Sequence, residues 1–204
     1  MNLQSQFGNI DIYVFDQILR GRIKPGMRVF DAGCGNGRNL IYLLREGYDV
    51  CGVDPNAAAV VAVRALGAAL APSGRAPDVR AESIEASSFP DAHADVVIAN
   101  AVLHFARDRA QFEAMLRGMW RVLRPGGILL ARLASTIGMA DRMTPIGGGR
   151  FRLPDGVEWF LVDAPAILEW TGRLGGELID PLKTTVVHEQ RAMTTWVMSR
   201  PAPR

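Results

Sequence analysis

The stretch FDAGCGNGRNL, residues Phe30–Leu40, decides the fold, because it joins a short apolar run to a run of helical periodicity. Gly33, Gly35 and Gly37 occupy alternate positions in it. Glycine lets a backbone turn tightly and lets a ligand come close to it. The stretch therefore predicts a buried strand, a ligand-binding loop and a helix, in that order.

Working outward from this loop, apolar runs alternate with segments of helical periodicity. The predicted strands and helices that follow this pattern are strands 27–32, 48–54, 78–83, 94–105 and 127–135, and helices 57–70 and 108–123. Such alternation predicts an α/β fold, doubly wound, with a mostly parallel sheet and helices on both faces. Residues 177–200 form two further strands with no room for a helix between them, so these must be antiparallel.

The chain length of 204 residues fits one domain, residues 1–204. Residues 1–24 form an N-terminal helical segment, in which Ile12, Phe15, Ile18 and Leu19 have helical spacing. Residues 136–160 are rich in Gly and Pro, and we expect them to form a lid and a short hairpin near the second substrate. A helix capped by Asp163 then follows, with Ile167, Leu168 and Leu174 on its inner side.

Composition narrows the range of partners. Lys and Arg number 23 against 21 Asp and Glu, with no basic run, so neither nucleic acid nor an anionic membrane is expected. The first residues do not resemble a signal peptide, and no apolar run reaches membrane-spanning length. Two cysteines fit a reducing, cytoplasmic location, and Cys34 is expected to be a small apolar filler. The three histidines have no metal-ligand spacing, so no metal is expected.

Ligands of open α/β sheets bind beyond the carboxyl ends of the strands. Three segments lie at such ends: the glycine loop, Asp54 and residues 82–91. The dinucleotide fingerprint needs Gly or Ala where this chain has Arg38, and no P-loop pattern is present. Asp54 stands 19 residues after Gly35, the spacing of an acid that binds a ribose diol.

The stretch FDAGCGNGRNLIYLLREGYDVCGVDPN resembles the first two motifs of class I S-adenosylmethionine-dependent methyltransferases. GCGNGRNLIYL and GYDV are especially similar to the tellurite-resistance methyltransferase group, and FPDAHADVVIANAVLHF and LRPGG resemble later motifs of the family. The resemblance covers roughly residues 25–135. It implies S-adenosyl-L-methionine as cofactor and a seven-stranded sheet of order 3-2-1-4-5-7-6 that ends in an antiparallel hairpin.

The resemblance also implies a role for individual residues, each named at its position in this chain. Gly33, Gly35 and Gly37 would line the methionine part of the cofactor, and Asp31 would help to hold its ammonium group. Asp54, followed by Pro55, would bind the ribose. Ser83 and Ile84 would flank the adenine, with Glu82 or Glu85 as alternatives to Ser83, where many members have Asp. Asn100 and Ala101 would contact the methionine end.

The implied reaction is methyl transfer to an acceptor that we expect to be a small molecule. Because a sulfonium methyl group is already activated, alignment supplies most of the rate, and a general base is needed only for a protonated nucleophile. His104 is a weak candidate for that base and otherwise a packing residue. Tyr13 is a candidate for closing over the cofactor, and Arg132, His188 and Arg191 are candidates for substrate contact. Each of the four is otherwise a structural residue.

A nicotinamide oxidoreductase and a non-catalytic module that binds the cofactor are the alternatives to a methyltransferase. The acceptor atom and the oligomeric state stay open.

Overall fold

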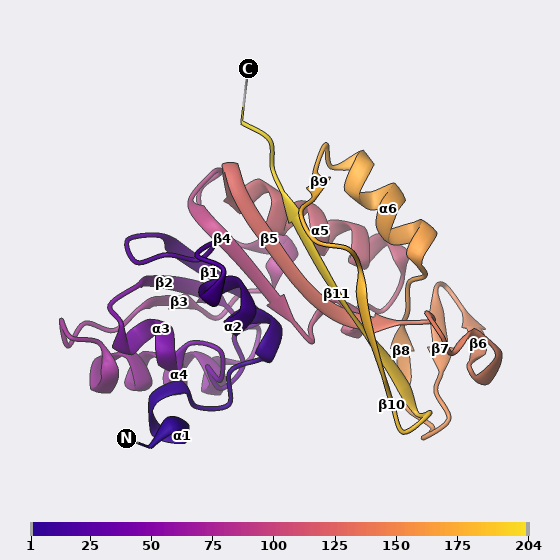
Figure 1. The fold of residues 1–204 in the computed structure, drawn as a ribbon, viewed down its shortest axis with the longest axis horizontal. Coiled ribbons are helices and arrows are strands. Elements are labelled where there is room, and N and C mark those ends of the chain that lie inside the picture. The colour runs from indigo at the N-terminus through magenta and orange to yellow at the C-terminus, as the bar shows by residue number, and fades with distance from the viewer. Residues whose placement is uncertain (1, 203–204) are drawn as a thin grey trace.

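The computed structural model describes residues 2–202 and contains two β-sheets with helices around the larger one (Figure 1). The larger sheet is built from β1 (Arg28–Ala32), β2 (Asp49–Val53), β3 (Asp78–Arg80), β4 (Ala94–Asn100), β5 (Leu123–Ser135), β9 (Glu177–Leu178), β10 (Lys183–Val187) and β11 (Arg191–Ser199). The smaller sheet consists of β6 (Thr144–Gly147), β7 (Arg150–Arg152) and β8 (Glu158–Phe160). The α-helices are α1 (Leu3–Phe7), α2 (Ile12–Leu19), α3 (Ile41–Arg45), α4 (Ala57–Leu70), α5 (Arg109–Val122) and α6 (Ala164–Arg173). Short 3₁₀ turns are η1 (Ile84–Ala86), η2 (Leu103–Phe105) and η3 (Ala140–Arg142).

The strand order of the larger sheet is β10-β11-β5-β4-β1-β2-β3. Strands β1 to β5 are parallel, whereas β11 is antiparallel to both β5 and β10. This path has the predicted order, with β10 and β11 as the sixth and seventh strands. The sheet has eight strands rather than seven, because the short β9 also pairs with β11.

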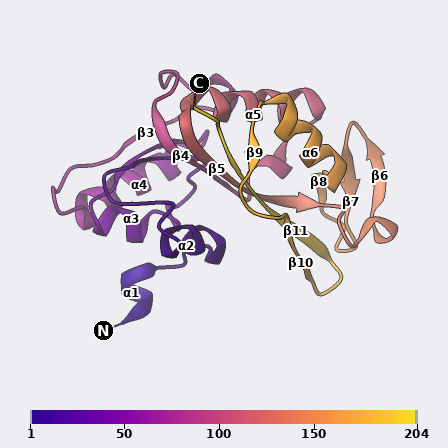
Figure 2. The same cartoon turned by 45° about the horizontal axis from the view of Figure 1, so that its top comes forward.

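Helices cover both faces of this sheet, as the alternation of side chains requires. Val29 packs with α2, α3 and α4 on one face, whereas its neighbour Phe30 packs with α5 and α6 on the other. Figure 2 shows α5 and α6 on the side of the sheet away from α2 and α3. The doubly wound prediction is therefore confirmed. None of the helices within residues 2–202 combines the length and apolarity needed to cross a membrane.

The segment 136–160 is more regular than predicted. Besides the hairpin of β7 and β8 around residues 154–156, it contains β6, so it forms a three-stranded antiparallel sheet. Strand β6 is exposed throughout, which leaves no apolar alternation to reveal it. Trp159 of β8 lies 4.4 Å, between ring centroids, from His104 of η2. The small sheet is thereby attached to the loop that follows β4.

Helix α2 turns a different side inward from the one predicted, whereas in α6 the prediction is correct for Ile167 and for Leu174, which packs against the core, and wrong for Leu168. In α2, Val14 and Gln17 are the buried residues, whereas Ile12 and Leu19 are 67% and 71% exposed. In α6, Ile167 and Trp170 are buried, but Leu168 is exposed. The predicted caps are present, since Asp108 accepts a hydrogen bond from Gln111 N at 2.8 Å and Asp163 accepts one from Ala166 N at 2.8 Å.

Candidate functional site

The glycine loop after β1 turns on three residues of positive φ: Gly33 at 84°, Gly35 at 49° and Gly37 at 73°. A Cβ on Gly33 would lie 2.7 Å from Val102 Cγ2, so this glycine allows close packing. A Cβ on Gly37 would lie 3.1 Å from side-chain atoms of α4. Gly35 has no atom within 4 Å of a Cβ position, so its backbone borders open space. The loop therefore packs at its two ends and offers its middle to a ligand.

Asp54 follows β2 and fastens the loop. Its Oδ2 accepts a hydrogen bond from Gly35 N at 2.8 Å, and its Oδ1 accepts one from Asn56 N at 2.9 Å. An ionised carboxylate has about four acceptor positions, so both oxygens can accept further hydrogen bonds. Asp54 and Pro55 border the same open space as Gly35.

Asp31, the fourth residue of β1, is almost completely buried. Burial and the nearby charge of Asp54 raise its carboxyl pKa to about 7, while the positive charge of Arg38 opposes this shift. No hydrogen bond contributes to the shift. The site thus contains a buried acid for which a cationic group would be a favourable neighbour.

The segment after β3 lies against the same space. Ser83, Ile84 and Glu85 border it, whereas Glu82 is engaged elsewhere by Ser88, whose N and Oγ donate to it at 2.8 and 2.6 Å. Helix α5 holds this segment closely, because a Cβ on Gly118 would lie 2.5 Å from Ile84 O. Ser83 and Glu85 thus line the cavity and Glu82 does not, although Glu85 also accepts a hydrogen bond from Gln111 Nε2 at 2.9 Å.

The end of β4 supplies Asn100 and Ala101. Asn100 is 7% exposed, and its Oδ1 accepts a hydrogen bond from Arg38 Nη2 at 3.1 Å. Its Nδ2 has no partner among the residues that the structure describes. Ala101 has a φ of 62°, which is uncommon for a residue with a side chain and marks a constrained backbone.

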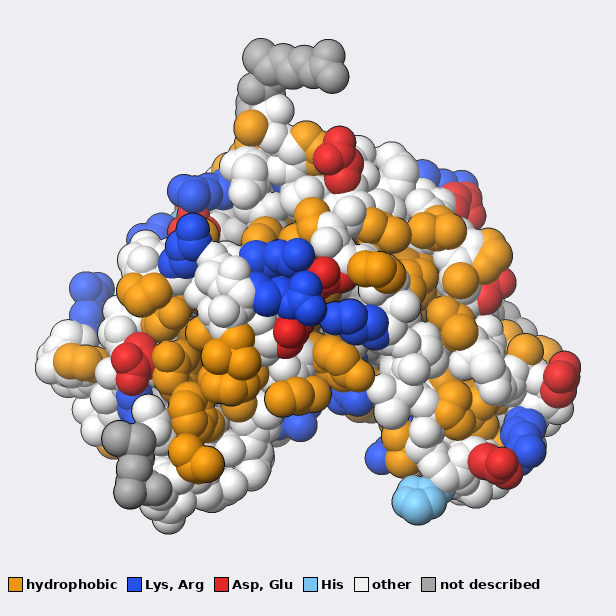
Figure 3. Space-filling view, in the orientation of Figure 1, with side chains coloured by type: hydrophobic (Ala, Val, Ile, Leu, Met, Phe, Trp, Pro, Cys, Tyr) orange, Lys and Arg blue, Asp and Glu red, His pale blue; other side chains and the backbone are white. Residues whose placement is uncertain are grey.

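These segments together enclose a cavity of about 840 Å³ at the carboxyl ends of β1, β2 and β4. Of the predicted cofactor residues, Asp31 and Gly37 do not line it: Asp31 lies beneath the loop and Gly37 packs on α4. The lining residues that were not predicted to bind the cofactor are Asn9, Cys34, Asn36, Arg38, Asn39, Glu85, Val102, Phe105, Gln111 and Met115, of which Glu85 was named as an alternative to Ser83. Arg38 could have been found, because it stands next to the glycine loop. The outline in Figure 3 is hollowed between the α1–α2 side of the molecule and the tip of the β10–β11 hairpin.

His104 does not line this cavity. It is 2% exposed, and its Nδ1 accepts a hydrogen bond from Ala134 N at 3.3 Å. Burial lowers its pKa to about 4, so the ring is neutral at pH 7. With Nδ1 accepting, the neutral ring carries its proton on Nε2 and has no free lone pair. This arrangement suits a packing residue beneath Trp159 better than a general base.

Cys34 and Cys51 are free, buried thiols whose pKa burial raises to about 12, in keeping with an inert filler role for Cys34. Within residues 2–202, no group of three His, Cys, Asp or Glu side chains is arranged to hold a metal ion.

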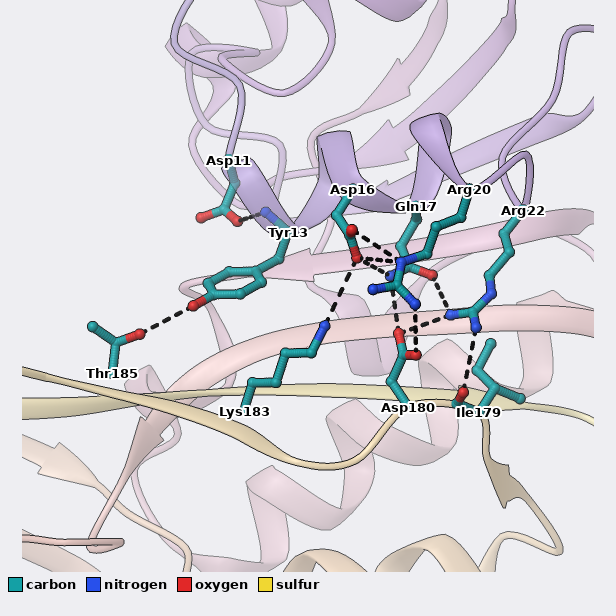
Figure 4. A network of polar contacts seen from close by, with 10 residues as sticks. All are labelled: Asp11, Tyr13, Asp16, Gln17, Arg20, Arg22, Ile179, Asp180, Lys183 and Thr185. Carbon is teal, nitrogen blue, oxygen red and sulfur yellow. Dashed lines mark hydrogen bonds and ion pairs between the residues drawn. The ribbon is translucent and has the colours of Figure 1, made fainter.

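Helix α2 spans the sheet from the cavity to the C-terminal strands. Asp11, its N-cap, lies 3.0 Å from Arg132 Nη1 of β5 and 3.8 Å from Arg38 Nη2. Tyr13 Oη lies 3.1 Å from Thr185 Oγ1 of β10. Figure 4 shows the far end of α2, where Gln17 donates to Asp180 at 3.0 Å. Neither Arg132 nor Tyr13 lines the cavity, but Asp11 links Arg132 to the lining residue Arg38. His188 and Arg191 are exposed on the β10–β11 hairpin.

The comparisons with known proteins agree with this geometry. A family model described as a methyltransferase domain matches residues 30–131. A methyltransferase of Synechocystis, itself uncharacterised, is 34% identical over 106 residues, which cover 52% of this chain and 46% of the relative. The tRNA 5-carboxymethoxyuridine methyltransferase of Escherichia coli is 27% identical over 114 residues, which cover 56% and 42%. The chain thus matches less than half the length of these curated relatives.

The fold has solved counterparts as well. The structure of a protein from Methanosarcina mazei described as a SAM-dependent methyltransferase aligns with a TM-score of 0.72 at 19% identity, over 91% of this chain and 98% of that one. At this identity the likeness concerns the fold. The family model, in contrast, spans half of the chain and includes the glycine loop, Asp54 and the end of β4. The chain therefore belongs to the methyltransferase domain family, in the class that uses S-adenosyl-L-methionine.

Proposed function

We propose that this chain transfers the methyl group of S-adenosylmethionine to a small-molecule acceptor. The observation that carries the proposal is the cavity of about 840 Å³, in which the glycine loop, Asp54 and the end of β4 meet. The residues present fit the cofactor. The backbone of Gly35 borders open space, and Asn100 Nδ2 is a donor without a partner among residues 2–202. Asp31 is a buried acid whose carboxylate would attract the ammonium group of the cofactor.

In this proposal, the loop backbone at Gly33 and Gly35 and the Asn100 amide hold the methionine part of the cofactor. Asp31 favours its ammonium group through charge, from beneath the loop, and Gly37 sets the loop's packing. The carboxylate of Asp54, beside Pro55, accepts hydrogen bonds from the ribose hydroxyls. Ile84 packs on the adenine, and the Ser83 hydroxyl or the Glu85 carboxylate accepts from its amine. Ala101 lies beside the reacting end.

When bound, S-adenosylmethionine supplies a methyl group on a positively charged sulfur, which keeps the electron pair of the broken S–C bond as the acceptor atom forms its new bond to carbon. The chain's own contribution is positional. It binds the cofactor and the acceptor in line and excludes water. Alignment of this kind lowers the activation barrier by up to about 7–11 kcal/mol when the reacting groups are well oriented. His104 is neutral and its Nδ1 is engaged, so a protonated nucleophile would need another base.

The acceptor is proposed to be a small molecule because Asn9 of the N-terminal segment borders the cavity together with the motif loops. One relative is described as a tRNA methyltransferase, so the charge balance of this chain does not exclude a nucleic acid. Acceptor assays therefore need both arms: a panel of small molecules and bulk tRNA, with S-adenosylhomocysteine release as the readout.

The first test is calorimetry with S-adenosylhomocysteine, with NADH titrated in parallel. We expect micromolar binding of the former and none of the latter. Asp54→Ala should weaken binding more than about tenfold, since charged hydrogen bonds contribute about 1.5–3 kcal/mol. Asp49→Ala, at the opposite end of β2, is the matched control. Absence of binding to the unmodified chain would sink the cofactor assignment, and equal losses in both variants would remove Asp54 from the site.

A further inference from the structure

Three buried side-chain polar atoms lack a hydrogen-bond partner among residues 2–202: Asn100 Nδ2, Arg132 Nε and Thr195 Oγ1. All three lie at one position across neighbouring strands. Asn100 of β4 is paired with Arg132 of β5, which is paired with Thr195 of β11. Side chains that are directly paired across a sheet point to the same face. We call these three residues the polar row.

An unpaired buried polar group costs about 1–3 kcal/mol, and folded proteins keep few of them. Their concentration in one row therefore calls for a ligand or for trapped water. The row begins at Asn100, which lines the cofactor cavity, and continues through Arg132 to Thr195, beneath α2. It extends from the cavity that Asn100 lines toward the C-terminal strands.

The charges around the row favour an anion. Arg132 and Arg38 share a single carboxylate, that of Asp11, at 3.0 and 3.8 Å. This group of three therefore has a formal charge of +1. The Oδ1 of Asn100 already accepts from Arg38, so its free Nδ2 can only donate. Arg132 Nε is also only a donor, and the Thr195 hydroxyl can donate or accept. The unpaired atoms thus require oxygen acceptors.

A movable cover lies over the row. Arg132 Cζ is 5.5 Å from the centre of the Tyr13 ring, and the arginine side chain keeps a fifth of its surface exposed. Tyr13 itself is only half-buried and is tied to the exposed Thr185 by one hydrogen bond. Figure 4 shows Tyr13 extending from α2 toward Thr185, apart from the ion pairs that fasten the rest of the helix. A rotation of this side chain opens the row without releasing α2.

We propose that the methyl acceptor carries a carboxylate, which binds at Arg132 and Thr195 beneath Tyr13, next to the Asn100 amide that holds the cofactor. The proposal rests on the proposed methyltransferase function and names the class of its substrate. A carboxylate matches the fork of a guanidinium, and its single negative charge balances the +1 of the Arg38, Asp11 and Arg132 group. A phosphate would bring up to two negative charges to that same group.

The test uses the chain saturated with S-adenosylhomocysteine, titrated by calorimetry with acetate, succinate, benzoate and 4-hydroxybenzoate, with the matching amides, and with inorganic phosphate. We expect at least one carboxylate to bind with a Kd below about 1 mM and at least about tenfold more tightly than its amide and than phosphate. Arg132→Gln should weaken it about tenfold and leave the affinity for S-adenosylhomocysteine within about twofold. Arg173→Gln, an exposed arginine of α6, is the control.

Thr195→Val is the second variant, in case Arg132→Gln does not fold. It removes an unpaired hydroxyl, so its Tm should rise while its carboxylate affinity falls at least about threefold. The proposal is overturned if every carboxylate binds more weakly than about 1 mM, if amide or phosphate binds as tightly, or if neither variant changes the affinity. These outcomes arise with S-adenosylhomocysteine already bound, so they are distinct from a failure of the cofactor assignment.

Discussion

Two cavities of nearly equal volume lie at opposite ends of the same parallel strands. The one at the carboxyl ends measures about 840 Å³, and the one at the amino ends of β1, β2 and β3 measures about 860 Å³. At the amino ends, charges are paired locally: Arg28 binds Asp49 at 2.6 Å, and Asp78 binds Arg80 at 2.7 Å. At the carboxyl ends, burial raises the pKa of Asp31 to about 7, and Asn100 Nδ2 has no hydrogen-bond partner among residues 2–202.

Because the two cavities have nearly the same volume but different charges, volume alone does not identify a binding site. Both cavities could hold a molecule of cofactor size. The carboxyl-end cavity is bordered by backbone of positive φ and by an unpaired buried donor, and the acid of raised pKa, Asp31, lies beneath its glycine loop. Each of these costs the folded chain stability, and a bound ligand can recover that cost. The following predictions test whether function is confined to this end.

The largest effect should come from Gly33→Ala, compared with Gly74→Ala near the other cavity. Both glycines have a positive φ, 84° and 63°. Only the Gly33 substitution also brings a Cβ to 2.7 Å from Val102, so it should shift the loop. We expect S-adenosylhomocysteine affinity to fall about thirtyfold or more for Gly33→Ala, whereas Gly74→Ala should cost only backbone strain of about 1 kcal/mol. Calorimetry measures the affinity of each variant for S-adenosylhomocysteine, and denaturant unfolding measures its stability. Equal losses of affinity in the two variants would contradict the prediction.

The next effect concerns pH. Asp31, with a pKa raised from 3.8 to about 7, is protonated in the free chain below that pH. An ammonium ligand favours the ionised carboxylate, so S-adenosylhomocysteine should bind about tenfold more tightly at pH 8 than at pH 5.5. Asp31→Asn should abolish this dependence. A pH-independent affinity in the unmodified chain would remove Asp31 from the ligand's surroundings.

The same group predicts a stability profile. Between pH 3.8 and about 7, the folded chain keeps a proton on Asp31 that the unfolded chain releases, so stability falls as pH rises. His104 acts in the opposite sense, because its pKa is lowered from 6.5 to about 4 and stability falls as pH drops through that window. The two contributions oppose each other, so Asp31→Asn should leave a stability that rises between pH 4 and 6.5. Urea unfolding at several pH values measures it; a stability that still falls with pH would contradict both assignments.

The smallest effect should come from Arg28→Gln at the amino ends. Its ion pair with Asp49 is about half exposed, with side-chain exposures of 40% and 55%. Exposed pairs contribute about 0–1 kcal/mol, so stability should change by no more than that. Affinity for S-adenosylhomocysteine should stay within about twofold. A larger loss of affinity would mean that the two ends of the sheet are coupled.

The cofactor side was predictable because its signals are local. The glycine spacing, the acid after the second strand and the apolar runs lie within short windows, and each determines its own backbone. The order of the strands then followed from the family resemblance, which these same windows carry. Glu82 and Glu85, which the sequence left open, differ in their partners: Glu82 accepts from Ser88, whereas Glu85 accepts from Gln111 and lines the cavity.

The contacts of α2 and of the proposed acceptor residues were less predictable because they join distant segments of the chain. Gln17 is buried since Asp180 receives its hydrogen bond, and no pattern near Gln17 indicates this. Asn9 and Arg132 likewise reach the site from distant segments. Helix α2 contains as many apolar residues on its exposed side as on its inner side, so periodicity alone chose the wrong face.

The attachment of α2 to the C-terminal strands also has a consequence for how the chain folds. Gln17 and Asp180 are 163 positions apart, and Tyr13 and Thr185 are 172 apart. A chain made from its N-terminus must complete nearly all of the sheet before α2 finds these partners, and contacts between distant segments form slowly. We therefore expect the strands and loops around the carboxyl-end cavity to assemble first and α2 to dock last. During synthesis, the methyl-donor side would exist for a time without its cover.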